Sequence, residues 1–527
     1  ELTFRELLGR VKESVLGAFG HQEVPFEKLV EALQSTRDTS RAPLVQVAFG
    51  LNGPARLPVL PGLSASEVKY EPGMAKFDFA LSVREDAEDL TGFWELNTDL
   101  FDVSTVERMA AHYQQVLESA VADPEARVGT LPLSGHREVP EKLDVARIQT
   151  RRPERVARDS VPEGFIAPRT GFEELVAGVW APLLGVKHVS AEAHFFEQGG
   201  HSLLVMQVAS RLRDVVGRDV PVRMLFENPT VSSLARSLET LVRGGPGAER
   251  SALVPVPRIG ALPQSFAQQR LWFLDRLEPD SPLYNIPLAL RLEGALDVGA
   301  LERAFESLVR RHESLRTTFH QEGQGAVQSI QAAGPVALPV VDLGGVPVMR
   351  REQEALRLAI EEGRRPFDLG KGPLLRATLL KLGEREHVLL LVVHHIVADG
   401  WSMGVLTKEL ETLYGAHLRG EAATLPELPV QYADYAVWQR EWLRGEVLEA
   451  QLSWWRARLA GAPEALEVPT DRSRPKVQSY RGASAPVRFS RELSEKLKRL
   501  SRQEGVTLYM TLLAGFQVLL ARYTGQW

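Results

Sequence analysis

Two short stretches of the sequence hold residues that could do chemistry. The first runs from Phe195 to Leu212, reads FFEQGGHSLLVMQVASRL, and places Ser202 directly before an amphipathic repeat. The second runs from His394 to Ser402 and reads HHIVADGWS. A serine at the start of a helix can accept hydrogen bonds from the first backbone N–H groups, or it can be a point of covalent attachment. A histidine with a pKa near ~6.5 can accept a proton at neutral pH.

Ser202 has the surroundings that an attachment site needs. Gly199 and Gly200 free the backbone to present the serine to another enzyme, and the start of a helix favours a phosphodiester. A hydrolase nucleophile has the pattern Gly-x-Ser-x-Gly, and here Leu204 replaces the second glycine. The sequence therefore favours attachment over hydrolysis, with a plain helix cap as the alternative.

The histidine motif predicts that one of its two histidines enters a site. Neighbouring residues of a strand point to opposite faces, so His394 and His395 cannot both face the same site. Asp399 follows the strand and could fix the loop, and Gly400 could offer a backbone N–H to an oxyanion. The same histidines and aspartate could bind a metal, but no further ligand cluster supports one, so we expect no metal site.

The composition limits the class of protein. The chain has 527 residues, enough for three or four domains, and its 44% hydrophobic and 25% charged content is that of a globular protein. The net charge of −6 gives no general reason to bind nucleic acid or an anionic membrane. Cysteine is absent, which excludes disulfides and thiolate sites and suits a reducing compartment. We expect a cytoplasmic location with neither nucleic acid nor membrane as partner.

Two linkers divide the chain into three blocks. Residues 134–168 are charged and proline-containing, and residues 243–261 are rich in glycine, proline and alanine. They separate blocks at residues 1–133, 169–242 and 262–527. The small middle block has helical periodicity throughout, and it offers little room for a cleft.

The outer blocks mix strands and helices. The continuous apolar run 386–398 predicts a buried strand, and residues 301–316 predict an amphipathic helix. Residues 77–86 and 90–101 predict paired strands before a helix at 105–121. The aromatic stretch 435–459 could bind nucleic acid, but its four tryptophans fit helical packing faces better. We therefore expect a multidomain chain in which α+β lobes flank a small all-α four-helix domain.

The middle block resembles the peptidyl carrier domains of nonribosomal peptide synthetases. The stretch HFFEQGGHSLLVMQVASRL carries the resemblance, with APRT at its entry and LFENPTVSSLA at its exit. The resemblance covers residues 169–242. It implies that Ser202 carries 4′-phosphopantetheine, attached by a phosphopantetheinyl transferase.

The last block resembles condensation domains, relatives of chloramphenicol acetyltransferase. HHIVADGWS is similar to their HHxxxDG signature, and SFAQQRLWFL, RRHESLRTTF, YADYAVWQR and SYRGAS follow the order of their other motifs. The resemblance implies that His395 is the catalytic histidine, with His394 and Gly400 beside it. It also implies that Asp399 is a structural acid paired with Arg316.

The first block, 1–133, resembles the C-terminal part of another condensation domain and contains no HHxxxDG motif. The last block, 262–527, covers the N-terminal lobe and part of the second lobe of a downstream one. Both ends look cut, so we interpret the chain as a fragment of a longer polypeptide. Because the motifs of the two blocks are complementary, we hypothesise that the blocks dock as one pseudo-complete domain with the carrier looped between them.

The resemblance implies a synthetase segment that transfers an aminoacyl or peptidyl thioester from Ser202 to an acceptor amine at His395. No adenylation domain lies between residues 133 and 169, so adenylation and a downstream carrier domain must be supplied elsewhere. Two alternatives remain open: a stand-alone acyltransferase that uses free acyl-CoA, and an inactive truncated scaffold.

Overall fold

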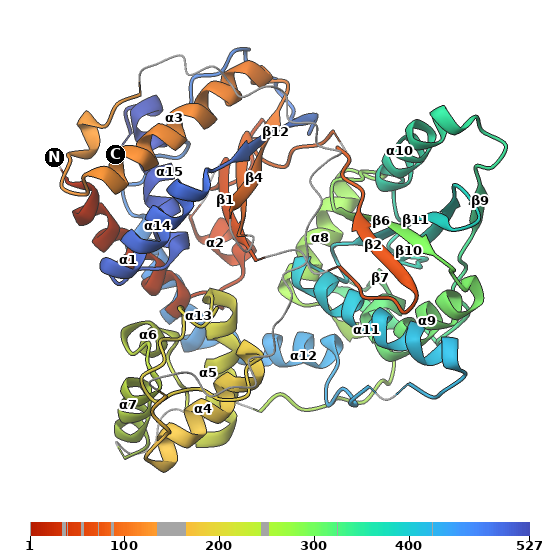
Figure 1. Cartoon of the computed structure of the whole chain (residues 1–527), viewed down its shortest axis with the longest axis horizontal. Helices are drawn as coiled ribbons and strands as arrows, with labels where there is room; N and C mark the ends of the chain where they lie inside the picture. Colours follow the sequence, from red (N-terminus) through yellow and green to blue (C-terminus); the bar gives the residue numbers. More distant parts are fainter. Residues whose placement is uncertain are drawn as a thin grey trace.

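The computed structural model describes residues 2–33, 38, 40–53, 57–71, 73–85, 89–133, 165–243, 252–323, 325–423 and 425–526. They form two α+β lobes and a small helical domain packed below one of them (Figure 1). The predicted fold class, α+β lobes flanking a four-helix all-α domain, is confirmed. Most of the first predicted linker, residues 134–164, and a part of the second, residues 244–251, lie outside the described residues.

The lobe that carries the histidine motif is built on a five-stranded sheet with the order β2-β6-β11-β10-β9. A second, three-stranded sheet has the order β5-β8-β7. The strands are β2 (Leu63–Glu67), β5 (Leu262–Pro263), β6 (Asn285–Gly294), β7 (Thr317–Glu322), β8 (Gly325–Ile330), β9 (Val340–Asp342), β10 (Leu375–Lys381) and β11 (Glu386–His394). The helices are α8 (Phe266–Leu277), α9 (Val298–Arg311), the 3-10 turn η3 (Glu313–Arg316), α10 (Val348–Arg364) and α11 (Gly400–Arg419).

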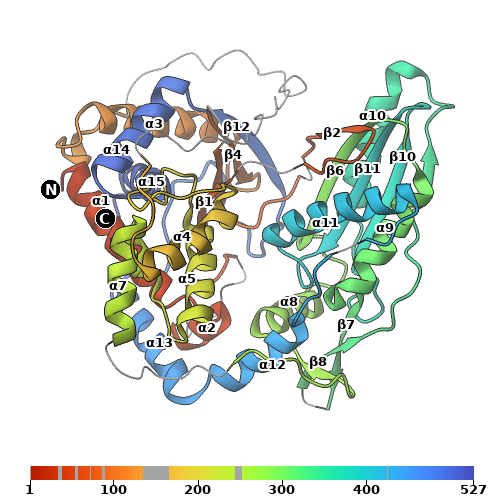
Figure 2. The ribbon, with the colours of Figure 1, turned by 60° about the horizontal axis from the view of Figure 1, so that its bottom comes forward.

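The other lobe, called the second lobe below, has a four-stranded sheet with the order β1-β3-β4-β12. Its strands are β1 (Val47–Asn52), β3 (Phe79–Glu85), β4 (Leu90–Asn97) and β12 (Gly482–Arg488). Its helices are α1 (Phe4–Gly20), α2 (Phe26–Leu33), α3 (Val103–Ala122), the 3-10 turn η1 (Val128–Thr130), α14 (Arg491–Gln503) and α15 (Leu508–Thr524). Helices α12 (Tyr432–Trp442) and α13 (Gly445–Leu459) connect the lobes along one side (Figure 2).

The two outer blocks of the sequence exchange edge strands. Strand β2 of the first block pairs antiparallel with β6 of the last block, with Leu63 opposite Gly294. Strand β12 of the last block pairs antiparallel with β4 of the first, with Gly482 opposite Asn97. Each block therefore completes a sheet of the other, and the hypothesis that the two blocks dock as one unit is confirmed.

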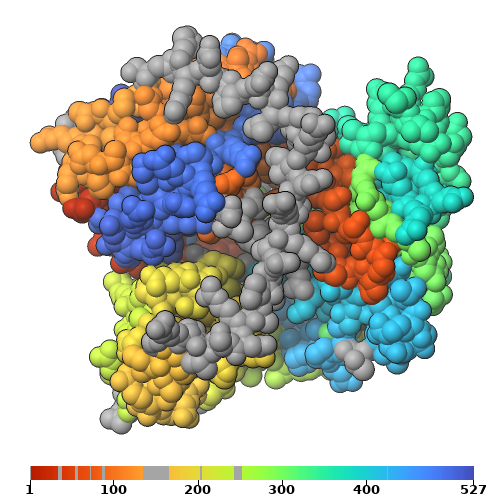
Figure 3. Space-filling view, in the orientation of Figure 1, coloured from red at the N-terminus to blue at the C-terminus, as the bar shows by residue number. Residues whose placement is uncertain are grey.

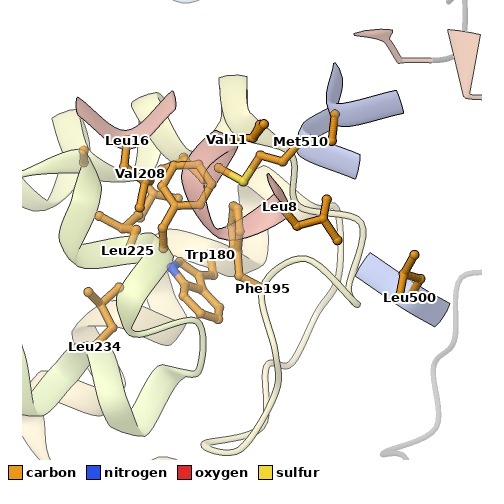
Figure 4. Close-up of a cluster of buried hydrophobic side chains, with 14 of the residues drawn as sticks. Leu8, Val11, Leu16, Trp180, Phe195, Val208, Leu225, Leu234, Leu500 and Met510 are labelled. Carbon is orange, nitrogen blue, oxygen red and sulfur yellow. The ribbon is translucent and has the colours of Figure 1, made fainter. Parts of the chain in front are cut away.

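The middle block forms four helices, α4 (Gly171–Leu184), α5 (Ser202–Val216), α6 (Val222–Glu227) and α7 (Val231–Arg243). Their apolar side chains surround Trp180 and Phe195, both fully buried. This core is continuous with apolar residues of α1, α14 and α15, among them Leu16, Leu500 and Met510 (Figure 4). The space-filling view shows the helical domain (yellow) directly beneath the second lobe (Figure 3).

Most of the predicted elements are found. Strands β3 and β4 pair antiparallel as expected from residues 77–86 and 90–101, and α3 covers the predicted helix at 105–121. The predicted helix 301–316 is α9 followed by the short turn η3. In α13, Trp454 stacks on the His21 ring at 4.4 Å, and Trp455 donates a hydrogen bond of 2.8 Å to the His21 carbonyl. These tryptophans thus pack between elements, half-buried.

Candidate functional site

Strand β11 brings the histidine motif to the interface of the two lobes. It lies between β6 and β10, and nearly every residue is buried, which explains its continuous apolar sequence. The strand stops at His394, short of the predicted residue 398, and His395 lies in the following turn. The backbone N–H of His395 donates to the carbonyl of Tyr284 at 2.8 Å, which fixes the start of this turn.

His394 supports the turn from inside. Its side chain is buried, and its Nδ1 accepts a hydrogen bond of 3.1 Å from the backbone N–H of Ile396. The ring meets the edge of Phe367 at 5.9 Å between centroids. Burial, helped by the charges of His395, Lys76 and Arg376, lowers the pKa of His394 to about 3. A neutral ring with an accepting Nδ1 is therefore the state that holds this turn.

His395 is half-buried and faces charged groups from both blocks. Burial lowers its pKa, and the ammonium of Lys76 lowers it further, while the Asp399 carboxylate and backbone hydrogen bonds oppose these two effects. The balance keeps the ring neutral at neutral pH. A neutral imidazole can accept a proton or a hydrogen bond from an amine.

Asp399 begins helix α11. It is the N-cap residue, and its Oδ1 accepts hydrogen bonds from the Ser402 backbone N–H at 2.7 Å and the Ser402 hydroxyl at 2.6 Å. Gly400 is the first helical residue, so its N–H has no acceptor within the helix. A backbone donor without a helical acceptor therefore lies beside the histidine turn, and its use for an oxyanion stays a prediction.

The predicted pair of Asp399 with Arg316 is not formed. Arg316 ends η3, and its guanidinium donates to the carbonyl of Gln331 and lies 3.8 Å from the Glu313 carboxylate. Asp399 instead forms the capping box of α11 with Ser402, three residues later, through its Oδ1. The Asp-x-x-Ser pattern was visible in the sequence and indicates the cap.

Other ion pairs, missed at the level of sequence, hold this part of the lobe together. Glu409 of α11 accepts from Arg311 at 3.1 Å and from His312 at 2.6 Å. Both residues belong to RRHESLRTTF (310–319), the second condensation-domain motif in chain order, which is thereby fixed to the helix that follows the histidine turn. Arg258 bridges Glu313 and the buried Asp434 of α12. The second motif therefore positions α11 through Glu409.

Ser202 is the first residue of helix α5, and the N-cap is His201, which makes no side-chain cap bond. The helix-cap alternative for Ser202 is thus not supported by the position of the residue. Gly199 has a φ of +92°, which an L side chain rarely adopts. A Cβ on Gly200 would lie 2.3 Å from Phe195 Cδ1 and 2.6 Å from the Phe195 carbonyl oxygen. Both glycines are therefore required by the loop before Ser202.

This loop fits a covalently attached phosphodiester. The first N–H groups of α5 lack helical acceptors and the positive end of the helix dipole lies there, so a negative charge is favoured. Among the residues that the structure describes, no group of three or more His, Asp or Glu side chains could hold a metal ion. Within the same residues no single helix is long and apolar enough to cross a membrane. One bent pair, Arg491–Gln503 with Leu508–Thr524, passes that test of length and composition together.

Comparison with known families gives two matches. The family described as "Condensation domain" matches residues 1–140 and 259–527, and the family described as "Phosphopantetheine attachment site" matches residues 174–238. The chain belongs to the condensation-domain family. Its fold is the chloramphenicol-acetyltransferase-like fold of that family, interrupted in the sequence by a phosphopantetheine-binding carrier domain. The predicted resemblance to nonribosomal peptide synthetases, with condensation segments on both sides of a carrier, is confirmed.

Several curated proteins are similar to the chain. One component of the linear gramicidin synthase of Brevibacillus parabrevis is 54% identical over 362 residues, which are 69% of this chain and 5% of that protein. A dimodular nonribosomal peptide synthase of Bacillus subtilis (strain 168) is 42% identical over 363 residues, 68% of this chain and 15% of that protein. The chain thus spans only a small part of the length of these relatives.

Among solved structures, the complex of the X-domain and OxyB from teicoplanin biosynthesis is 36% identical. It covers 50% of this chain and 57% of that chain with a TM-score of 0.44. The first condensation domain of the CDA synthetase is 24% identical with a TM-score of 0.42, covering 50% of this chain and 63% of that one.

Proposed function

We propose that the chain carries an aminoacyl or peptidyl thioester on 4′-phosphopantetheine at Ser202 and forms a peptide bond at the His395 site. The observation that carries this proposal is the presence, on one chain, of an attachment loop at the start of α5 and a neutral histidine at the interface of two condensation lobes. We also propose the domain limits read from the sequence: condensation segments at 1–133 and 262–527, and a carrier at 169–242.

The attachment step uses the Ser202 hydroxyl as the nucleophile. A phosphopantetheinyl transferase catalyses the step, and coenzyme A is the donor. The serine oxygen forms the new P–O bond, the pyrophosphate bond of coenzyme A breaks, and 3′,5′-ADP leaves. The group, once bound, supplies a thiol that holds the acyl chain as a thioester. The chain itself presents Ser202 at the end of a loop whose path Gly199 and Gly200 allow. The start of α5 then stabilises the phosphodiester.

The condensation step joins the thioester carbon to an acceptor amine. The C–N bond forms, the C–S bond breaks, and the proton of the amine ends on the leaving thiol. His395 is the group that faces the amine and accepts its hydrogen bond or proton, and the N–H of Gly400 stabilises the oxyanion. Tethering of the reactants to carriers supplies a high effective concentration, so modest chemical assistance is sufficient.

The segment between residues 133 and 169 has no room for an adenylation domain, so we propose that the chain works with partners. An adenylation domain that loads amino acids, and a downstream carrier that presents the acceptor amine, are supplied by other segments or chains. A cytoplasmic location, where coenzyme A and ATP are available, completes the proposal.

The first experiment is intact mass spectrometry. The protein and a Ser202→Ala variant are incubated with coenzyme A and a promiscuous phosphopantetheinyl transferase, and the mass should rise by one phosphopantetheine in the parent alone. A donor-loaded chain is then mixed with an aminoacyl carrier, and His395→Ala should abolish product. Turnover of free acyl-CoA by Ser202→Ala would instead support the stand-alone acyltransferase, and loading without any condensation would support the inactive scaffold.

A further inference from the structure

Lys76 comes from the first block, yet its backbone is fixed against the last. The segment around it pairs with the SYRGAS motif: the Gly482 N–H donates to the Gly73 carbonyl at 3.0 Å, and the Ala75 N–H donates to the Tyr480 carbonyl at 2.9 Å. The carbonyl of Lys76 itself accepts a hydrogen bond of 3.2 Å from Gln478 Nε2. These bonds hold Lys76 at the junction of the two blocks.

The side chain of Lys76 reaches the histidine turn through Tyr284. Its Nζ lies 4.9 Å from the centroid of the Tyr284 ring, within the range of a cation–π contact. The carbonyl of the same tyrosine accepts the backbone N–H of His395, and its ring lies 6.5 Å from that of His394. Tyr284 therefore joins the ammonium to both histidines.

The ammonium has no ion-pair partner among the carboxylates of the described residues, although it is half-buried. Glu95 lies close, but its Oε1 accepts the backbone N–H of Lys76 at 3.2 Å, and burial raises the pKa of this carboxyl. Removing an ammonium from water without an ion pair costs free energy. A buried ammonium without an ion pair departs from the usual pairing of buried charges, and such departures are expected at functional sites.

We propose that Lys76 is a positioning residue of the condensation site, which braces Tyr284 against the turn and keeps His395 in its proton-accepting form. The inference rests on the proposed function only in assigning a reaction to His395. It adds a functional residue that lies outside the histidine motif and is supplied by the other block.

The charges around the site support this assignment. Lys76 and His394 face His395 as cationic or titratable neighbours, and Asp399 opposes them from the start of α11. Lys76 in turn faces Glu95 of β4 and Arg270 of α8, and burial lowers its own pKa. Removing the charge of Lys76 leaves Asp399 as the dominant charged neighbour of His395, which favours the imidazolium.

The test is a direct titration of His395 in the full chain. The 12 histidines are labelled with ¹³C at Cε1, and the signal of His395 is assigned by its loss in His395→Gln. Lys76→Met should raise the pKa of His395 by about 1, and Lys76→Arg should restore the original value. In the condensation assay with the loaded chain, the acid limb of the kcat/KM profile should move to higher pH by the same amount in Lys76→Met. At a pH on that limb the rate should fall by up to about tenfold.

Lys371→Met is the matched control, because Lys371 is largely exposed, pairs with Asp368, and is not among the charges that shift the pKa of His395, so it should change neither readout. An unchanged pKa of His395 in Lys76→Met would overturn the proposal. If Lys76→Met does not fold, the titration is done with Lys76→Gln, which keeps a polar side chain. A raised pKa of His395 in that variant supports the proposal, and an unchanged pKa overturns it. If the pKa shifts but even the parent forms no peptide bond, the proposed function fails while the placement of Lys76 is supported.

Discussion

The carrier and the condensation unit differ in how much of the chain each site needs. The attachment loop is local: Phe195, Gly199, Gly200 and the start of α5 lie within a few residues, and one small domain supports them. The histidine site is assembled from both outer blocks, with β2 and β12 exchanged between the two sheets. A substitution at the junction of the blocks should therefore damage one site and leave the other intact.

The largest effect is expected at the pair of Arg474 and Asp78. Arg474 donates to both oxygens of the buried Asp78, at 2.8 Å for Nη1 to Oδ1, and joins the last block to the first. Arg474→Met leaves the carboxylate buried without its partner, which should lower the free energy of unfolding of the condensation unit by about 3–5 kcal/mol. Chemical denaturation followed by tryptophan fluorescence measures this loss.

Arg472→Met is the control for this prediction. Arg472 pairs with Asp102 on the surface, with both side chains about half exposed, so its loss should cost no more than about 1 kcal/mol. Loading of Ser202 with phosphopantetheine should proceed at the parental rate in both variants. Equal stabilities of the two variants would contradict the view that the blocks depend on each other.

A smaller effect is expected from Gly482→Ala at the same junction. A Cβ there would lie 2.4 Å from the carbonyl carbon of Met74 and 2.6 Å from the backbone nitrogen of Ala75, so the SYRGAS turn must move away from the segment that holds Lys76. The expected cost is about 2–3 kcal/mol in the same denaturation experiment. Gly9→Ala, in α1 with nothing near its Cβ, should be neutral or slightly stabilising.

These contacts also mark the limit of what the sequence could reveal. The loop before Ser202 was readable because its glycines, its serine and the helix start are adjacent. The histidine strand was readable too, but its end was misplaced, since Ile396, Val397 and Ala398 are apolar and buried although they lie beyond the strand. Burial alone does not distinguish a strand from a buried turn.

Long-range partners were the main omission. The pairing of Asp399 with Arg316 was taken from a family resemblance, and the structure does not form it: Asp399 caps α11 through Ser402, while Arg316 contacts Gln331 and Glu313. Lys76 was missed because nothing near it in the sequence indicates a site. Its position depends on the register between the first block and the SYRGAS motif, which no local pattern encodes.

In the carrier, Gly200→Ala should slow the loading of Ser202. The added Cβ would meet the ring and the carbonyl of Phe195, which is fully buried beside Trp180, so the loop must shift away from the start of α5. We expect a rate of phosphopantetheine transfer reduced about tenfold, equivalent to about 1.4 kcal/mol, measured by the time course of intact mass. Gly178→Ala, in α4 with open space around its Cβ, is the matched variant and should load normally. A normal rate in Gly200→Ala would show that the loop is not a geometric constraint.

The smallest effect concerns the contact between the two regions. Phe19 of α1 stacks on Phe226 of α6 at 5.9 Å, and Phe226 stacks on Phe196 at 5.3 Å, so three rings connect the second lobe to the loop that leads to Ser202. A double-mutant cycle of Phe19→Ala and Phe226→Ala should give a coupling of about 0.5–1.5 kcal/mol in unfolding. The control cycle combines Phe226→Ala with Phe93→Ala, at an exposed position of β4, and should give no coupling free energy.

The coupling between Phe19 and Phe226 measures how strongly this ring pair links the carrier to the second lobe. A carrier must leave its resting contact to deliver a thioester, and the Phe19–Phe226 pair is one part of that contact, beside the apolar core shared with α1, α14 and α15. Gln22 also donates to Met206 Sδ at 3.3 Å, so a polar contact accompanies the ring stack. A coupling of zero would mean that this ring pair does not help to hold the carrier, which would then be held by the apolar core shared with α1, α14 and α15 and by its linkers. The ring pair would then lie between the two regions without linking their stabilities.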